Sequence, residues 1–144
     1  MGNIIVIGGG AAGMMAACAA GRGGHEVTLI EQNEKLGKKL FITGKGRCNL
    51  TNANNLEVLF SNVMSNPKFL YSAFYTFSNE MVMDFFREQG LALKTERGSR
   101  VFPVSDHSSD VIAVLKKALD AAGVRIRLNT RVTELLTEEQ RPVE

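Results

Sequence analysis

Residues 3–31, NIIVIGGGAAGMMAACAAGRGGHEVTLIE, decide the fold class of this chain. Residues 3–7 are apolar and β-branched, which predicts a central strand that is covered on both faces of a sheet. Residues 11–22 are rich in the helix formers Ala and Met, and glycines end the run. Residues 27–30 predict a second strand. A strand, a helix and a strand within about 30 residues have the size of one βαβ unit.

The glycine-rich turn inside this unit matches the pattern G-x-G-x-x-G. Gly8 permits a tight turn, Gly10 lets the backbone approach a diphosphate, and Gly13 lets the helix pack closely on the strand. The helix opens at Ala11 and Ala12, so its free N–H groups and its positive end face the phosphates. The alternative is an ordinary turn, but the strand before it and the helix after it favour dinucleotide binding.

An acidic residue stands where such a site needs one. Glu31 follows the second strand, 18 residues after Gly13, where a carboxylate can accept hydrogen bonds from the hydroxyls of an adenosine ribose. A 2′-phosphate would meet like charge there, so an NADP-type ribose is disfavoured. The alternative is a solvated residue at a strand end. The pattern alone leaves FAD and NAD open, because both present a diphosphate and an adenosine ribose.

The middle of the chain is mostly helical. Residues 32–54 predict a long connection with one short helical turn. Residues 55–89 predict two or three helices, broken at Pro67 and near Ser78, and Ser78 can cap the last of them.

The remaining elements complete an α/β pattern. Short strands are expected at 91–95 and 100–102, and a helix through 110–122 that Gly123 closes. Ser108 or Ser109 can cap this helix. The last strands that we expect are 124–128 and 130–136. This order predicts a Rossmann-like α/β fold, with a mostly parallel sheet and helices on both faces.

The bulk composition narrows the class of protein. Of 144 residues, 44% are hydrophobic and 22% are charged, which fits a packed core. The net charge of +2 is too small to indicate a nucleic-acid or membrane partner, so we expect a small-molecule substrate. The two cysteines match no metal or disulfide spacing. No signal peptide or membrane-spanning run is recognisable, and a cytoplasmic location is expected.

Three segments carry a resemblance to a known family: VIGGGAAGMMAA at 6–17, LIEQNEKLGKKLFITGKGRCNLTN at 29–52 and GSRVFPVSDHSSDV at 98–111. Together they resemble the BaiN-like or aminoacetone oxidase-like FAD-binding flavoproteins, also called NAD(FAD)-utilising dehydrogenases. The resemblance implies an FAD-binding domain of the two-dinucleotide-binding-domain flavoprotein type. It also implies that the whole protein is an FAD-dependent oxidoreductase that passes hydride through the flavin, with NAD(P)H as a candidate electron donor.

The resemblance implies contacts to the adenosine half of FAD, position by position. Ala12 and Gly13 would contact the diphosphate. Glu31, with Gln32 beside it, would contact the ribose. Val132, on a strand late in the chain, would contact the adenine through its backbone.

It also implies contacts from the basic loop to the rest of the cofactor. Lys39 and Arg47 would lie near the diphosphate or the ribityl chain, and Cys48 and Asn49 closer to the flavin. Arg47 can pair with a phosphate in a bidentate way, although a solvated basic loop is the common alternative. No catalytic residue and no metal ligand is predicted.

Members of this family are far longer, and a C-terminal segment with a Gly-acid pair completes their FAD domain. No Gly-Asp or Gly-Glu pair occurs here. We therefore expect 1–144 to be the N-terminal portion of a discontinuous FAD-binding domain, without its substrate domain and inactive alone. An NAD-binding Rossmann module and a non-catalytic nucleotide-binding or interaction fragment are the alternatives. The sequence leaves the substrate and the oligomeric state undetermined.

Overall fold

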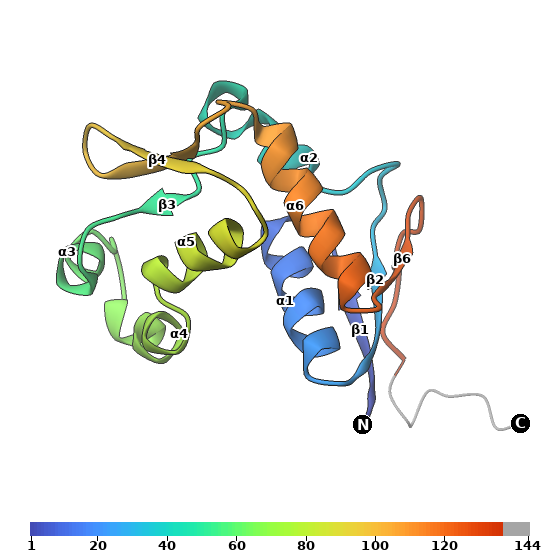
Figure 1. Ribbon diagram of the computed structural model, residues 1–144. Coiled ribbons are helices and arrows are strands. Elements are labelled where there is room, and N and C mark those ends of the chain that lie inside the picture. Colours follow the sequence, from blue (N-terminus) through green and yellow to red (C-terminus); the bar gives the residue numbers. More distant parts are fainter. Residues whose placement is uncertain (137–144) are drawn as a thin grey trace, which may run out of the picture. The chain divides into compact units, whose positions relative to one another are not determined.

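The computed structural model describes residues 1–136, and the chain divides into two compact units. The first unit combines Met1–Lys38 with the residues from Ala118 onward. The second unit is Lys39–Lys117. Figure 1 shows the elements along the chain.

The first unit is built on a three-stranded parallel sheet. Its strands run in the order β1 (Asn3–Ile7), β2 (Glu26–Ile30) and β6 (Arg125–Arg127). α1 (Ala11–Arg22) connects β1 to β2 and packs on both strands (Figure 1). The predicted βαβ unit and the Rossmann-like fold class are thereby confirmed.

One face of this sheet is covered by α1. Val6, Leu29 and Ile126 lie in register on that face, and Leu29 is fully buried. Ile5 and Ile7 alternate onto the opposite face, where they are 66% and 53% exposed. β1 was predicted as a central strand covered on both faces. That prediction is wrong for residues 1–136, in which β1 is an edge strand and α1 lies on the Val6 side only.

The last turn of α6 (Ser108–Ala121) belongs to the first unit. Gly123 ends this helix as predicted, with a φ of +69° that suits glycine. The N–H of Val124 donates to the carbonyl of Leu119 at 3.1 Å, which satisfies one of the last carbonyls of the helix.

The segment after β6 differs from its prediction. Residues 131–136 form no strand, and Leu135 is 74% exposed. A strand needs a ladder partner, and none of the residues 1–136 pairs with this segment. Val132 therefore lies in irregular structure beyond the end of β6, and the prediction that it lies on a strand is wrong.

The second unit contains an antiparallel sheet in the order β3 (Thr51–Asn52), β5 (Arg100–Pro103) and β4 (Leu93–Glu96). The β4–β5 hairpin confirms the two short strands predicted around the turn at 96–99. β3 was not predicted, because two polar residues in a glycine-rich loop carry no alternation of apolar side chains.

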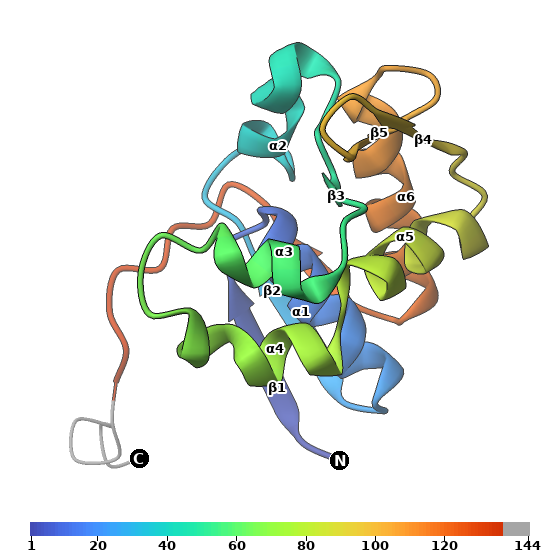
Figure 2. The same cartoon turned by 90° about the vertical axis from the view of Figure 1, so that its left-hand side faces the viewer.

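Short helices make up the rest of this unit. α3 (Leu56–Ser61) and α4 (Tyr71–Thr76) lie side by side (Figures 1 and 2), and the ring of Phe60 packs edge-on against the ring of Tyr71, with 4.5 Å between the ring centres. Ser78 caps α5 as predicted, since its hydroxyl accepts from the N–H of Met81. The helices are α2 (Lys38–Ile42), η1 (Thr43–Gly46), α3 (Leu56–Ser61), η2 (Pro67–Leu70), α4 (Tyr71–Thr76) and α5 (Asn79–Glu88).

The predicted cap of α6 is wrong. Ser108 is the first residue of the helix, and its hydroxyl donates to the carbonyl of Phe41 at 2.7 Å instead of accepting from the helix. Ser109 lies inside the helix and bonds with Asp110. Within residues 1–136, no helix combines the length and the apolar character needed to cross a bilayer.

Candidate functional site

The turn between β1 and α1 is tied to the end of β2. Gly8 has a φ of +103°, which glycine adopts without steric cost. Its N–H donates to the carbonyl of Ile30 at 2.8 Å. The first glycine of the motif therefore makes the tight turn that the sequence predicted.

The N-terminus of α1 presents main-chain donors. Gly10 is its N-cap, and no side chain caps this end of the helix. The N–H groups of the first turn, at Ala11, Ala12 and Gly13, have no acceptor within the helix. They lie at the positive end of the helix dipole, a favourable place for an anion.

The three glycines of the turn differ in the space around them. A Cβ at Gly13 would lie 1.8 Å from the carbonyl oxygen of Gly8, so only glycine lets α1 approach β1 this closely. A Cβ at Gly10 would meet nothing within 4 Å, so a ligand can reach the backbone there. Gly9, an x position of the motif, is also constrained, because a Cβ would lie 2.3 Å from Cδ2 of Leu36.

Glu31 is buried beside this turn, with 8% of the surface of the residue exposed. Oε2 accepts from the main-chain N–H of Gly9 at 2.6 Å. Oε1 accepts from the main-chain N–H and the side-chain amide of Asn33, at 2.8 and 2.6 Å. Burial alone would raise the pKa of Glu31, but the hydrogen bonds from Asn33 and Gly9 outweigh burial and lower it. The site therefore holds an ionised carboxylate.

A pocket of about 200 Å³ lies where β1 and β2 end. Four predicted cofactor residues line it: Gly8, Glu31, Gln32 and Val132. In α/β proteins, ligands bind in the crevice at the carboxyl ends of the strands. The structure thus brings the acid, the glycine turn and the segment around Val132 to one cavity.

The far wall of the pocket comes from the segment after β6. Thr130 and Arg131 line the pocket, and the N–H of Thr130 donates to the carbonyl of Glu31 at 2.9 Å. Sequence reasoning missed both residues, together with Gly9 and Asn33. Thr130, Arg131 and Gly9 reach the site from segments far from Glu31 in the sequence, whereas Asn33 contacts Glu31 two residues before it. The only signal in the sequence was the middle glycine of the run GGG.

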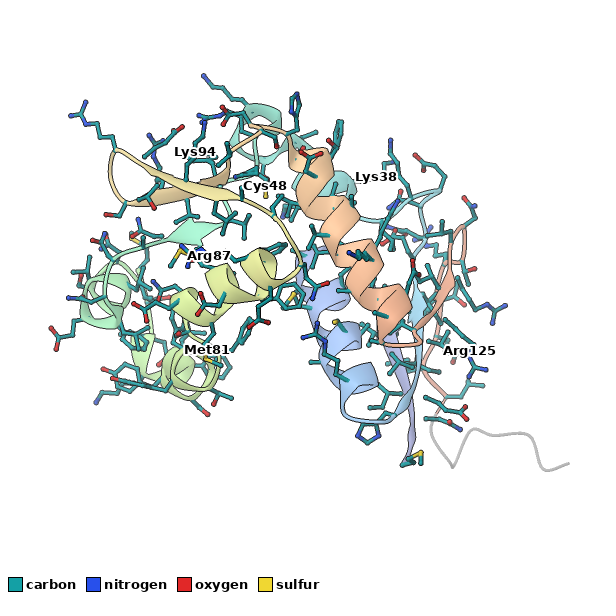
Figure 3. All side chains as sticks on the ribbon, viewed as in Figure 1. Lys38, Cys48, Met81, Arg87, Lys94 and Arg125 are labelled. Carbon is teal, nitrogen blue, oxygen red and sulfur yellow. The ribbon has the colours of Figure 1, made fainter. Side chains whose placement is uncertain are left out.

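The predicted cofactor residues of the basic loop, from Lys39 to Asn49, lie in the second unit. The guanidinium of Arg47 pairs with Glu96 and with Asp106, 2.6 Å from Oδ1 of Asp106, and it lies 4.2 Å from the centre of the Phe102 ring. Lys94, labelled in Figure 3, pairs with Asp106 at 2.6 Å. These hydrogen bonds raise the pKa of Arg47 and lower those of Glu96 and Asp106. A phosphate would compete with two carboxylates for Arg47.

The remaining residues of the basic loop differ in exposure. Lys39 is exposed in α2, and Cys48, labelled in Figure 3, is 2% exposed. Burial raises the pKa of the Cys48 thiol. In the amide orientation that suits its neighbours, Asn49 donates to the carbonyls of Thr51 and Val101 at 3.1 and 3.3 Å. The flavin contacts implied for Cys48 and Asn49 stay predictions.

Comparison with known proteins gives a family match over nearly the whole chain. Residues 2–144 match the model of the HI0933-like protein Rossmann domain. A 3-dehydro-bile acid delta(4,6)-reductase of Clostridium scindens is 37% identical over 137 residues, which cover 94% of this chain and 33% of that protein. A ribosomal RNA dihydrouridine synthase of Haemophilus influenzae is 31% identical over 132 residues, 91% of this chain and 32% of that protein. The chain spans about a third of the length of these relatives.

Solved structures share the fold. An open conformation of a flavocytochrome c3 fumarate reductase superposes with a TM-score of 0.62, at 20% identity, over 95% of this chain and 28% of that one. At this level of identity the likeness concerns the fold, and it agrees with the Rossmann-like class.

Proposed function

The chain belongs to the family of HI0933-like Rossmann domains, and on that premise we propose that it binds the ADP half of FAD. We further propose that residues 1–144 are the N-terminal portion of a discontinuous FAD-binding domain. The observation that carries the proposal is the pocket at the ends of β1 and β2, where Glu31 and the glycine turn lie together.

The described residues fit the adenosine diphosphate group. The diphosphate would lie against the N-terminus of α1, where the space over Gly10 is open and the N–H groups of Ala12 and Gly13 have no helical acceptor. Glu31 would accept a hydrogen bond from a ribose hydroxyl, since Oε2 carries one protein hydrogen bond and an oxygen accepts two. The backbone of Val132, on the far wall, would meet the adenine.

For the whole protein we propose a flavin-dependent oxidoreductase. The flavin supplies hydride transfer, while the protein binds and orients the cofactor. The names of the relatives describe a reductase of a 3-dehydro-bile acid and a synthase of dihydrouridine in ribosomal RNA. NAD(P)H is the proposed electron donor. The expectation that nucleic acid is no partner rests on net charge alone and stays a prediction.

A fluorescence titration of FAD with the purified chain, and isothermal titration calorimetry with ADP, NAD and NADP, test this function. We expect saturable binding of FAD and ADP, and weaker binding of NADP because its 2′-phosphate meets the Glu31 carboxylate. Gly10→Val should abolish binding, since the side chain fills the space over the helix N-terminus. Gly2→Val is the matched control, because its Cβ comes no closer than 3.9 Å to another residue's atoms.

Three outcomes would contradict the proposal that this chain binds FAD at the glycine turn. Equal binding by the wild type and by Gly10→Val would show that the ligand does not bind at the turn between β1 and α1. A clear preference for NAD over FAD would assign the nicotinamide alternative. Absence of saturable binding for every nucleotide, with folding confirmed by circular dichroism, would contradict nucleotide binding by this chain.

A further inference from the structure

We infer that Asn33 positions Glu31 for the ribose and thereby sets how strongly the pocket recognises a ribose hydroxyl. Asn33 follows Glu31 by two residues and lies outside the glycine motif. The inference rests on the proposed binding of an adenine nucleotide.

The acceptor sites of the carboxylate support this role. A carboxylate offers about four lone-pair sites, two on each oxygen. Asn33 occupies both sites of Oε1, one through its main-chain N–H at 2.8 Å and one through its amide Nδ2 at 2.6 Å. Gly9 occupies one site of Oε2. These three bonds leave acceptor capacity on Oε2, the oxygen that also contacts the glycine turn, and the main-chain N–H of Gln32 interacts with the same carboxylate.

The amide of Asn33 is itself held in place. Nζ of Lys38 donates to Oδ1 of Asn33 at 3.4 Å, which directs Nδ2 towards Glu31. The main-chain carbonyl of Asn33 accepts from the N–H of Asn129 at 3.0 Å, one residue before the far wall of the pocket. Asn33 thus connects the acid on one wall to the segment that forms the other.

A carboxylate held by three N–H donors loses little freedom when a ligand hydroxyl binds to it, because its orientation is already fixed. Removal of the Asn33 amide leaves Oε1 with one donor and lets the carboxylate rotate. The contribution of the ribose hydroxyl to the binding free energy should therefore fall. The contribution of the diphosphate should not change, because the N-terminus of α1 would hold that group.

The experiment measures the Kd of the purified chain for ADP, 2′-deoxy-ADP and 3′-deoxy-ADP. In the wild type, loss of the hydroxyl that meets Glu31 should weaken binding by about tenfold or more, since tenfold is near the lower end of what a hydrogen bond to a charged group contributes. Asn33→Ala should reduce that factor to about threefold or less. Asn33→Ser, which keeps a short side-chain donor, should restore part of it. Asn62→Ala, which removes an amide that donates to Val58 in α3, is the matched control.

The outcomes separate this inference from the proposed function. If Asn33→Ala weakens all three ligands by one common factor, Asn33 is structural only and the inference is wrong. If the wild type binds ADP without penalty for either deoxy form, nucleotide binding stands but the role of Asn33 does not. If the wild type binds none of the three, both fail together.

Discussion

The Glu31 carboxylate accepts a 2.6 Å hydrogen bond from the main-chain N–H of Gly9. This bond ties the end of β2 to the turn after β1, and both residues are buried. A carboxylate oxygen that accepts N–H donors in such a place both shapes the turn and stays charged.

Glu31→Gln should lower the free energy of unfolding by about 1–3 kcal/mol at neutral pH, because an amide nitrogen would face the N–H of Gly9 or Asn33. Urea unfolding measures this loss. Glu88→Gln, an exposed acid in α5, should change stability by less than about 0.5 kcal/mol.

The same substitution should change the response to acid. The pKa of Glu31 is below its ordinary value of 4.5, so its contribution is complete above pH 4.5 and is lost as pH falls through the folded-state pKa. Glu31→Gln should therefore lose less stability than the wild type when pH is lowered below 4.5. Parallel acid curves for the two proteins would contradict an ionised, hydrogen-bonded Glu31.

Gly13→Ala should destabilise the fold. The new methyl would overlap the carbonyl oxygen of Gly8, and relief of such overpacking costs roughly 1–3 kcal/mol. Gly2→Ala adds the same methyl without a close contact and should stay within about 0.5 kcal/mol of the wild type. Equal unfolding midpoints for the two variants would show that α1 does not approach the turn this closely.

The group of four charges formed by Arg47, Lys94, Glu96 and Asp106 gives a salt-dependent prediction. Asp106→Asn removes the negative charge that pairs with Arg47 and Lys94 but keeps a side chain that tolerates the φ of +59° at this position. The Tm should fall at low salt, and the gap to the wild type should narrow in 1 M NaCl, because the group is partly exposed and is screened.

Low pH should also reduce the difference in Tm between Asp106→Asn and the wild type. The pKa of Asp106 is below its ordinary value of 3.8, so its contribution is lost as pH falls below 3.8 through the folded-state pKa. Asp84→Asn, in an exposed pair with Arg87, is the control and should leave the Tm nearly unchanged. If the difference in Tm between Asp106→Asn and the wild type changes with neither salt nor pH, the loss of stability comes from packing and not from charge.

Cys48 should resist alkylation in the folded protein. Burial closes access to the thiol and raises its pKa, so little thiolate is present at pH 8. Mass spectrometry after brief iodoacetamide treatment should find Cys48 unmodified, and modified once urea is added. Rapid labelling of Cys48 without urea would show that the TGKGRCNLTN loop is open.

The sequence was sufficient to predict the parts of the fold that depend on neighbours in the chain. The apolar run before Gly8, the Ala- and Met-rich helix and the glycines that end it are local signals, and β1, α1 and β2 follow them closely. Ser78 as a cap and Gly123 as a helix end are equally local.

Contacts between distant segments could not be predicted in the same way. Gly9 bonds to a residue 22 positions away, and the partners of Arg47 lie 49 and 59 positions away. Whether a strand forms also depends on its partner, so the apolar pattern at 130–136 predicts a strand that residues 1–136 do not contain.

We propose that the pocket beside the β1–α1 turn holds the adenosine diphosphate half of FAD. The most direct measurement is a ¹⁵N NMR titration of the chain with ADP, which locates the ligand amide by amide. We expect saturable shifts of the amide signals of Ala12, Gly13, Glu31 and Val132, all absent in Gly10→Val. Binding with shifts confined to the second unit, or no shift at any of these four amides, would contradict it.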